Sequence, residues 1–430
     1  MRLHTASWLA VSAVSLSMLV ACPAHHVPDP TTPSPDPQPC AAADTQGAET
    51  RTGKFVASAQ AVPGEYIVVL RAPRPGEKTL APSMMAQSLS ARYGGAVFLT
   101  YEHALRGFAT RMSADQAKAM SADPEVEYVE ENGVMRISDT QPDATWGIDR
   151  VDQRDLPLNQ TYLYNASGKG VHAYIVDTGI RITHSEFGGR ADHAFDSIGD
   201  EQKGNDCNGH GTHVAATVGG NVYGVAKNVR LHAVRVLNCS GSGTTAGVIA
   251  GVDWVANNRQ LPAVANMSLG GAKSSSLDDA VRRAIAAGVT FMVAAGNENQ
   301  NACNVSPART PEAITVGATT NADSRASFSN YGSCVDVFAP GHQITSAWLS
   351  DDNATRVLSG TSMATPHVTG LAALFLERNP NAAAAAVATA LVDNSTPGKV
   401  ANAGACSPNR LMFSGFVGGS PTFQTAHDGR

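Results

Sequence analysis

Residues 359–367 read SGTSMATPH, and apolar residues continue this segment through Leu376. The pattern predicts a helix that begins close to Ser362. Unpaired backbone N–H groups and the positive end of the helix dipole at such a position can hold an anion. Because capping is the commonest role of a serine ahead of a helix, this segment alone leaves open whether Ser362 is a nucleophile.

Two upstream segments carry a carboxylate and an imidazole. Residues 176–179 read VDTG, which places Asp177 at the end of an apolar strand, and residues 208–215 read NGHGTHVA, which places His210 between two glycines. Glycines there let the backbone pass close to a substrate and leave the imidazole uncrowded. For the neighbouring His213 we favour a structural role.

Two other kinds of site compete for these motifs. Asp-Thr-Gly is also the signature of aspartic proteases, but those enzymes need two carboxylates that share a proton, and the chain has no second Asp-Thr-Gly or Asp-Ser-Gly. A zinc site would explain the histidines, but the His-Glu-x-x-His pattern of zinc proteases is missing. Both kinds of site are therefore disfavoured.

The chain from Trp146 onward alternates apolar strands with helices. We expect strands at residues 171–176, 231–237, 263–267 and 290–294, and helices at residues 213–218, 246–257 and 277–287. This alternation predicts an α/β fold, a mostly parallel sheet with helices on both faces. Functional groups of such a fold collect at the carboxyl ends of strands and the amino ends of helices.

The order of the three motifs along the chain is aspartate, histidine, serine, which differs from the orders of chymotrypsin and the α/β-hydrolases. The motifs resemble the three active-site motifs of the subtilisin superfamily, and the resemblance covers the chain from about Gly64 to about Ser414. Residues 266–271 (NMSLGG) and 328–332 (FSNYG) further resemble the proteinase K branch, especially aqualysin-type bacterial enzymes. The resemblance implies a subtilisin-like serine endopeptidase.

The resemblance also implies roles for individual residues. Asp177, His210 and Ser362 would form a catalytic triad, in which Ser362 attacks the scissile carbonyl and His210 transfers its proton. Asn297 follows a strand end, as the family's oxyanion-hole asparagine does, and would act with the backbone N–H of Ser362. No cofactor is expected for catalysis.

Substrate binding would use strand edges that pair with an extended peptide, as in the family. Backbone pairing tolerates many sequences, so we expect broad cleavage of proteins and peptides, and small residues at 294–296 would leave room for a large hydrophobic or aromatic P1 side chain. The residues expected to bind substrate are Gly241, Ser242, Gly243, Ser268, Leu269, Gly270, Ala294, Ala295 and Gly296.

Two structural calcium sites are expected at positions that match related extracellular enzymes. For the first site a solvated acidic turn is the alternative. The ligands of the first site would be Asp149, Asp152, Gln153 and Asn159, and those of the second would be Asp336 and the carbonyls of Pro311 and Ala313.

Seven cysteines fit an exported protein better than a cytosolic one. The family pattern implies disulfides that join Cys207 to Cys239 and Cys303 to Cys334. Cys406 has no partner in that pattern, so it either pairs with Cys40 or remains a free thiol.

The N-terminus is typical of an export signal, because Arg2 precedes an apolar stretch from Trp8 to Val20. Residues 19–22 (LVAC) resemble the lipobox of bacterial lipoproteins, in which Cys22 would carry a lipid; an ordinary signal peptide is the alternative. We expect a signal at 1–22, a Pro-rich linker at 23–60, a small α+β domain at 61–138, the catalytic domain at 139–415 and a tail at 416–430.

The small domain resembles the inhibitor-type propeptide of the family, which implies a zymogen that cuts itself between about Ile137 and Gln141. The propeptide would then stay bound as an inhibitor. A lipid-anchored precursor would in this way release a mature enzyme, expected to be an extracellular monomer.

Composition excludes several other classes of protein. Hydrophobic residues make up 43% of the chain and charged residues 16%, which favours folded domains over disorder. A formal net charge of −6 gives no electrostatic basis for binding nucleic acid. Two alternatives remain: a non-catalytic subtilase-like binding protein and a serine esterase.

Overall fold

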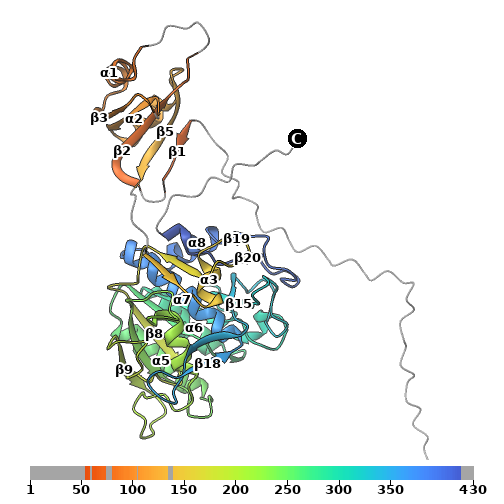
Figure 1. Cartoon of the computed structure of the whole chain (residues 1–430). Coiled ribbons are helices and arrows are strands. Elements are labelled where there is room, and N and C mark those ends of the chain that lie inside the picture. Colours follow the sequence, from red (N-terminus) through yellow and green to blue (C-terminus); the bar gives the residue numbers. More distant parts are fainter. Residues whose placement is uncertain (1–53, 59–60, 74–79, 104, 134–138, 418–430) are drawn as a thin grey trace, which may run out of the picture. The chain divides into compact units, whose positions relative to one another are not determined.

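The computed structural model describes residues 54–58, 61–73, 80–103, 105–133 and 139–417, which form two successive domains described separately below (Figure 1). The predictions for the N-terminal signal and for the lipid on Cys22 lie outside the described residues. The linker predicted at 23–60 is wrong at its C-terminal end, because Phe55 and Val56 form a strand that pairs with Val129 and Glu130 of the smaller domain. Within the described ranges, no helix is both long enough and apolar enough to cross a membrane.

The smaller domain is an α+β unit whose sheet has the strand order β1-β5-β2-β4-β3. Strand β2 is antiparallel to β4 and β5, and β1 is parallel to β5. The elements are β1 (Phe55–Val56), β2 (Ala61–Leu70), α1 (Pro82–Tyr93), β3 (Ala96–Tyr101), β4 (Gly107–Arg111), α2 (Ala114–Ser121) and β5 (Val126–Gly133).

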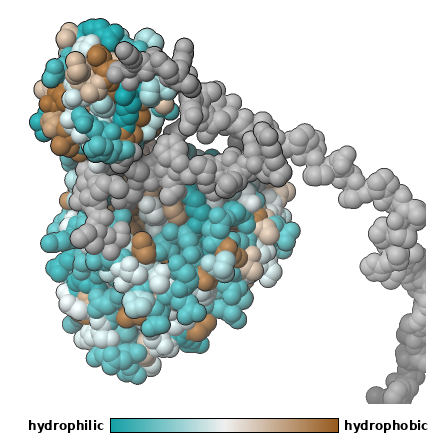
Figure 2. Space-filling view, turned by 45° about the horizontal axis from the view of Figure 1, so that its top comes forward, coloured by the Kyte–Doolittle hydropathy of each residue, from teal (hydrophilic) through white to brown (hydrophobic). Residues whose placement is uncertain are grey.

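The core of this domain is apolar and includes the fully buried Leu89 and Met120 from its two helices. Helix α2 begins with a capping box, in which Ser113 Oγ accepts from the backbone N–H of Gln116 and the Gln116 side chain accepts from that of Ser113. The domain also exposes large apolar side chains, among them Met84 and Leu99. Figure 2 shows larger hydrophobic areas on this domain than the scattered ones on the visible face of the larger domain.

The larger domain, which is expected to be catalytic, is built on a nine-stranded sheet of order β19-β20-β16-β15-β13-β11-β8-β10-β9. All neighbouring strands are parallel except β19 and β20, so the predicted α/β fold is confirmed. The sheet strands are β8 (His172–Asp177), β9 (Ala191–Asp196), β10 (Arg230–Arg235), β11 (Ala263–Met267), β13 (Val289–Ala294), β15 (Ile314–Thr319), β16 (Val337–Pro340), β19 (Thr396–Pro397) and β20 (Arg410–Leu411).

Helices cover both faces of this sheet, and three short ribbons complete the domain. The helices are α3 (Trp146–Val151), α4 (His210–Gly219), α5 (Thr245–Asn258), α6 (Ser275–Ala286), η1 (Ala302–Asn304), α7 (Thr361–Arg378), α8 (Ala384–Asp393) and η2 (Gly415–Val417). The ribbons pair β6 (Asp139–Pro142) with β7 (Thr161–Tyr164), β12 (Gly271–Ala272) with β14 (Val305–Ser306), and β17 (Ile344–Ala347) with β18 (Thr355–Leu358).

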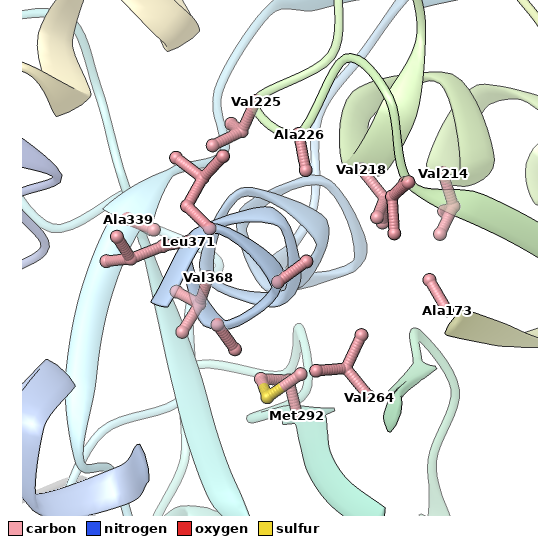
Figure 3. Close-up of a cluster of buried hydrophobic side chains, with 14 of the residues drawn as sticks. Ala173, Val214, Val218, Val225, Ala226, Val264, Met292, Ala339, Val368 and Leu371 are labelled. Carbon is pink, nitrogen blue, oxygen red and sulfur yellow. The ribbon is translucent and has the colours of Figure 1, made fainter. Parts of the chain in front are cut away.

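Strand β8 is buried on both faces, which explains its nearly continuous apolar sequence. Ala173 and Ile175 belong to one apolar cluster, and Tyr174 and Val176 belong to the cluster on the other face. Helix α7 runs through the first cluster, where its Val368 and Leu371 are surrounded by side chains of the sheet and of α4 (Figure 3). The strands that follow β8 in the chain are added on both sides of it, with β10 and β9 on one side and β11 on the other. In folds of this kind a site forms at the strand where the order reverses.

The C-terminal end of the domain lies slightly beyond the predicted boundary at residue 415. Val417 is buried in the cluster around α7, and the ring of Phe416 packs against that of Phe375. Residues 416 and 417, which the sequence assigned to the tail, therefore pack with this domain; a segment this short shows no periodicity in the sequence.

Candidate active site

Asp177 and His210 form a hydrogen-bonded pair at the carboxyl end of β8, in which the Asp177 carboxylate is fully buried and the imidazole is partly exposed. The Nδ1 of His210 is 2.8 Å from Asp177 Oδ1 and 3.0 Å from Oδ2. Because Nδ1 donates to the carboxylate, Nε2 of a neutral His210 is left as a proton acceptor. Burial alone would lower the pKa of His210, but the Asp177 carboxylate, with a smaller contribution from Asp206, raises the pKa above its usual value.

Glycines allow the two motifs to approach each other closely. Gly209 has a φ of 105°, and a Cβ there would lie 2.5 Å from the Trp348 ring. A Cβ on Gly211 would lie 2.1 Å from the carbonyl oxygen of Gly179, which belongs to the aspartate motif. A side chain at either position would therefore force the backbone around His210 to move.

Asp206 is a buried residue that the sequence analysis missed. Its Oδ1 accepts hydrogen bonds from the Thr178 hydroxyl at 2.9 Å and from the backbone N–H groups of Asn208 and Gly209 at 2.9 and 2.8 Å. Its Oδ2 accepts from the N–H and the hydroxyl of Thr212 at 2.9 and 2.6 Å. One carboxylate thus ties the histidine loop to the residue that follows Asp177. An acidic residue four positions before His210 was the only available signal.

Ser362 is the second residue of α7, after Gly360. Its Oγ donates to the carbonyl oxygen of Ser268 at 3.1 Å. A serine hydroxyl has one proton, so in this conformation it is not donated to His210, and the hydroxyl must rotate to reach the imidazole. Catalytic hydrogen bonds often form fully only with substrate bound, so this resting geometry does not exclude a nucleophile.

Asn297 lies just after β13 and is fixed through its side-chain oxygen. Oδ1 accepts from the backbone N–H and the hydroxyl of Thr361 at 2.8 and 3.0 Å. This pattern assigns the carbonyl end of the amide to Thr361 and leaves Nδ2 to donate elsewhere. The asparagine also satisfies one of the unpaired N–H groups at the start of α7.

A cavity of about 370 Å³ opens beside these groups. Asn297 and Ser362 line it together with four of the residues expected to bind substrate, namely Leu269, Gly270, Ala294 and Gly296. Glu298 also lines the cavity and was not expected there; its carboxylate accepts from Asn330 Nδ2 at 2.8 Å.

The other residues expected to bind substrate lie outside the cavity lining. Ala295 is fully buried, and Ser268 is buried beside Ser362 rather than in the cavity. Residues 241–243 are exposed, and they belong to no strand of the described structure. An exposed backbone segment of this kind is free to pair with an extended peptide.

The first expected calcium site contains two carboxylates, those of Asp149 and Asp152, whose environments differ. Asp149 Oδ1 accepts from the Gln153 side chain at 3.3 Å and from the Asn159 backbone N–H at 3.4 Å. Asp152 Oδ1 is buried and makes no hydrogen bond. Burial, together with the charge of Asp149, raises the pKa of Asp152 to about 7.

The second expected calcium site has a single buried carboxylate. Burial raises the pKa of Asp336 to about 6, although its Oδ2 accepts from the backbone N–H of Thr315 at 2.7 Å. Pro311 and Ala313 precede β15, and Asp336 precedes β16. Strands β15 and β16 are paired in the sheet. Among the described residues, no group of three or more His, Cys, Asp or Glu side chains is placed to hold a metal.

Both expected disulfides are present. Cys207 bonds Cys239, and Cys303 bonds Cys334. The first disulfide joins the loop before His210 to the exposed segment at 240–243. Cys406 is disulfide-bonded as well, so the free-thiol alternative is wrong; the question whether Cys40 is its partner lies outside the described residues.

His213 has the structural role that we favoured. Its Nε2 lies 3.1 Å from the carbonyl oxygens of both Ile344 and Arg356, and the ring is fully buried. Burial lowers the pKa of His213 to about 4, so the ring is neutral.

Comparisons with known proteins show the family to which the chain belongs. Residues 168–410 match the subtilase family, and residues 65–138 match the peptidase inhibitor I9 family. The chain is 52% identical to an extracellular serine proteinase of Thermus sp., over 83% of this chain and 91% of the relative. It is 48% identical to alkaline serine exoprotease A of Vibrio alginolyticus, over 82% of this chain and 68% of the relative.

A solved structure of a cold-adapted subtilisin-like serine proteinase is also similar. Its TM-score is 0.62 and its sequence is 56% identical, with 63% of this chain and 98% of the solved chain covered. The chain therefore belongs to the subtilase family of serine endopeptidases, and its N-terminal domain is an inhibitor-type propeptide.

Proposed function

We propose that Asp177, His210 and Ser362 are the catalytic triad of a secreted endopeptidase. The observation that carries this proposal is the 2.8 Å bond between His210 and Asp177. Ser362 lines a cavity together with Asn297, which gives a substrate access to the proposed nucleophile. His210 Nε2 accepts the Ser362 proton as Oγ attacks the scissile carbonyl, and the same nitrogen then donates the proton to the leaving amine. Water completes the cycle by hydrolysing the acyl-enzyme.

The oxyanion of the tetrahedral intermediate would be held by Asn297 Nδ2 and the backbone N–H of Ser362. The fixed Oδ1 of Asn297 supports this role, because an amide that is anchored at one end needs no reorganisation when the negative charge develops.

The cavity would receive the P1 side chain. Its size and its small lining residues Gly270, Ala294 and Gly296 favour a large hydrophobic or aromatic group. The exposed segment 241–243 and residues 268–270 would pair with the substrate backbone on either side, so cleavage is broad.

The propeptide domain would inhibit the enzyme that it precedes. Strand β6 begins at Asp139 and is paired with β7, so a mature chain that starts near Asp139 keeps this strand. Cleavage there would also release the enzyme from a lipid on Cys22. Mature enzyme would then be extracellular.

Calcium would stabilise the fold rather than act in hydrolysis. The first site fits a cation, because a buried, unpaired Asp152 oxygen lies near Asp149, and hard cations prefer such oxygens. Asp149, Asp152, Gln153 and Asn159 would hold one ion, and Asp336 with the carbonyls of Pro311 and Ala313 would hold a second.

An assay of the purified protein on casein and on a short p-nitrophenyl ester tests this function. We expect both to be cleaved, and both activities to be lost in Ser362→Ala. Ester cleavage without casein cleavage would indicate an esterase, and no cleavage of either would indicate a binding protein.

A further inference from the structure

The carbonyl oxygen of Ser362 lacks its usual partner within α7. In an α-helix the C=O of one residue accepts from the N–H four residues later, and here that residue is Pro366, which has no N–H. A carbonyl left without a partner in a partly buried position is costly, so a donor from elsewhere is expected.

Ser268 supplies this donor. Its Oγ donates to the Ser362 carbonyl oxygen at 2.8 Å, whereas Ser362 Oγ donates to the Ser268 carbonyl oxygen at 3.1 Å. Each serine side chain therefore bonds the backbone of the other, although they are 94 positions apart. Ser268 directly follows β11, so the bonds join the end of this strand to the start of α7.

The Ser268 hydroxyl is itself held from the interior. Asn266 Nδ2 donates to Ser268 Oγ at 2.9 Å, and Asn266 Oδ1 accepts from the Thr369 hydroxyl at 2.9 Å. Asn266 and Thr369 are fully buried. Because Ser268 Oγ accepts from Asn266, its single proton is directed to Ser362.

We propose that Ser268 is a positioning residue whose hydroxyl replaces the helix hydrogen bond that Pro366 removes. This inference rests on the proposed role of Ser362 as nucleophile. For attack, the Ser362 hydroxyl must leave the Ser268 carbonyl and turn to His210. The bond from the Ser268 hydroxyl to the Ser362 carbonyl involves no reacting atom and persists, so the backbone of the nucleophile stays in place while its side chain rotates.

The first test is Ser268→Ala in the full chain. We expect kcat for a short peptide substrate to fall roughly ten- to thirtyfold with KM changed less than about twofold, because an unsatisfied carbonyl displaces the nucleophile but not the cavity. Ser395→Ala is the matched control: Ser395 is also buried and its hydroxyl also donates to a helix carbonyl, that of Val392. Its kcat should be unchanged.

The second test restores the missing donor. In Pro366→Ala, residue 366 regains an N–H that can bond the Ser362 carbonyl. Ser268→Ala should then lower kcat less than about threefold in this background. An equal loss in both backgrounds would overturn the inference.

A pair of Ser268 variants tests the inference even if Pro366→Ala does not fold. Ser268→Thr keeps the hydroxyl and Ser268→Val has the same shape without it, so the threonine variant should have about tenfold higher kcat than the valine variant. Equal kcat values would contradict the inference. Ser362→Ala is measured in parallel: residual activity there would refute the proposed nucleophile, whereas an inactive Ser362→Ala with an unaffected Ser268→Ala would refute only the role of Ser268.

Discussion

The two halves of the proposed active site differ in how completely their hydrogen bonds are formed. On one side, the Asp177–His210 pair and the loop held by Asp206 are joined by bonds of 2.6 to 3.0 Å. On the other side, the Ser362 hydroxyl donates to a backbone carbonyl, and Asn297 is fixed only through its oxygen. We infer that His210 is in place before a substrate binds. The bond from the Ser362 hydroxyl to His210 and the bond from Asn297 Nδ2 to the oxyanion form only when a substrate is present.

The largest effect should come from breaking the preformed half. Asp177→Ala removes the acceptor that fixes the tautomer and orientation of His210, and kcat should fall about 10⁴-fold with the fold retained. Steady-state kinetics on a peptide substrate measures the change. A loss below about tenfold would mean that the pair does not act in catalysis.

A smaller loss is expected in the other half. Asn297→Ala should lower kcat about 10²- to 10³-fold with KM nearly unchanged, because its Nδ2 is used only when the oxyanion forms. A change confined to KM would place Asn297 in ground-state binding instead.

The Asp206 carboxylate should have a still smaller effect, visible in the pH profile. Its charge helps to raise the pKa of His210, and catalysis needs neutral His210, so activity is lost as pH falls through this pKa. Asp206→Asn should therefore shift the acidic limb of kcat/KM to lower pH and reduce its maximum about tenfold. The exposed Asp351 offers a matched control, since Asp351→Asn should leave the profile unchanged. An acidic limb of the kcat/KM profile that stays at the same pH in Asp206→Asn would refute the electrostatic role of Asp206.

Calcium should change stability and leave kcat unaffected, because both candidate ion sites lie apart from the cavity. A chelator should lower Tm by about 5 to 10 °C, and added calcium should restore it. Calorimetry of Asp152→Ala and Asp336→Ala should each show a weaker response. An unchanged response in both variants would remove the case for these sites.

The sequence predicted the elements better than the contacts between them. The strands around β8 and helices α4 to α7 were predicted to within a few residues, because buried strands and amphipathic helices have distinct apolar patterns. The proposed triad came from three local motifs that resemble those of the subtilisin superfamily. The ribbon of β6 and β7 was not predicted, since its short strands carry no alternation.

The polar network behind the site could not be predicted either. Ser268 and Ser362 bond each other across 94 positions, and no local pattern encodes such a contact. In the sequence Asp206 looks like an ordinary acidic turn residue, and only the fold shows that its carboxylate accepts from the Thr178 hydroxyl. Hydrogen bonds of this kind depend on backbone geometry, which only the structure supplies.

Covalent labelling tests the central claim most directly. A fluorophosphonate reacts with a serine only where a base and an oxyanion site activate it, so mass spectrometry of the labelled protein should find one adduct, on the peptide that contains Ser362. The same treatment of Ser362→Ala should give no adduct, and that variant should accumulate as a precursor uncut near Asp139. An adduct on another serine, or labelling that persists in Ser362→Ala, would contradict the account.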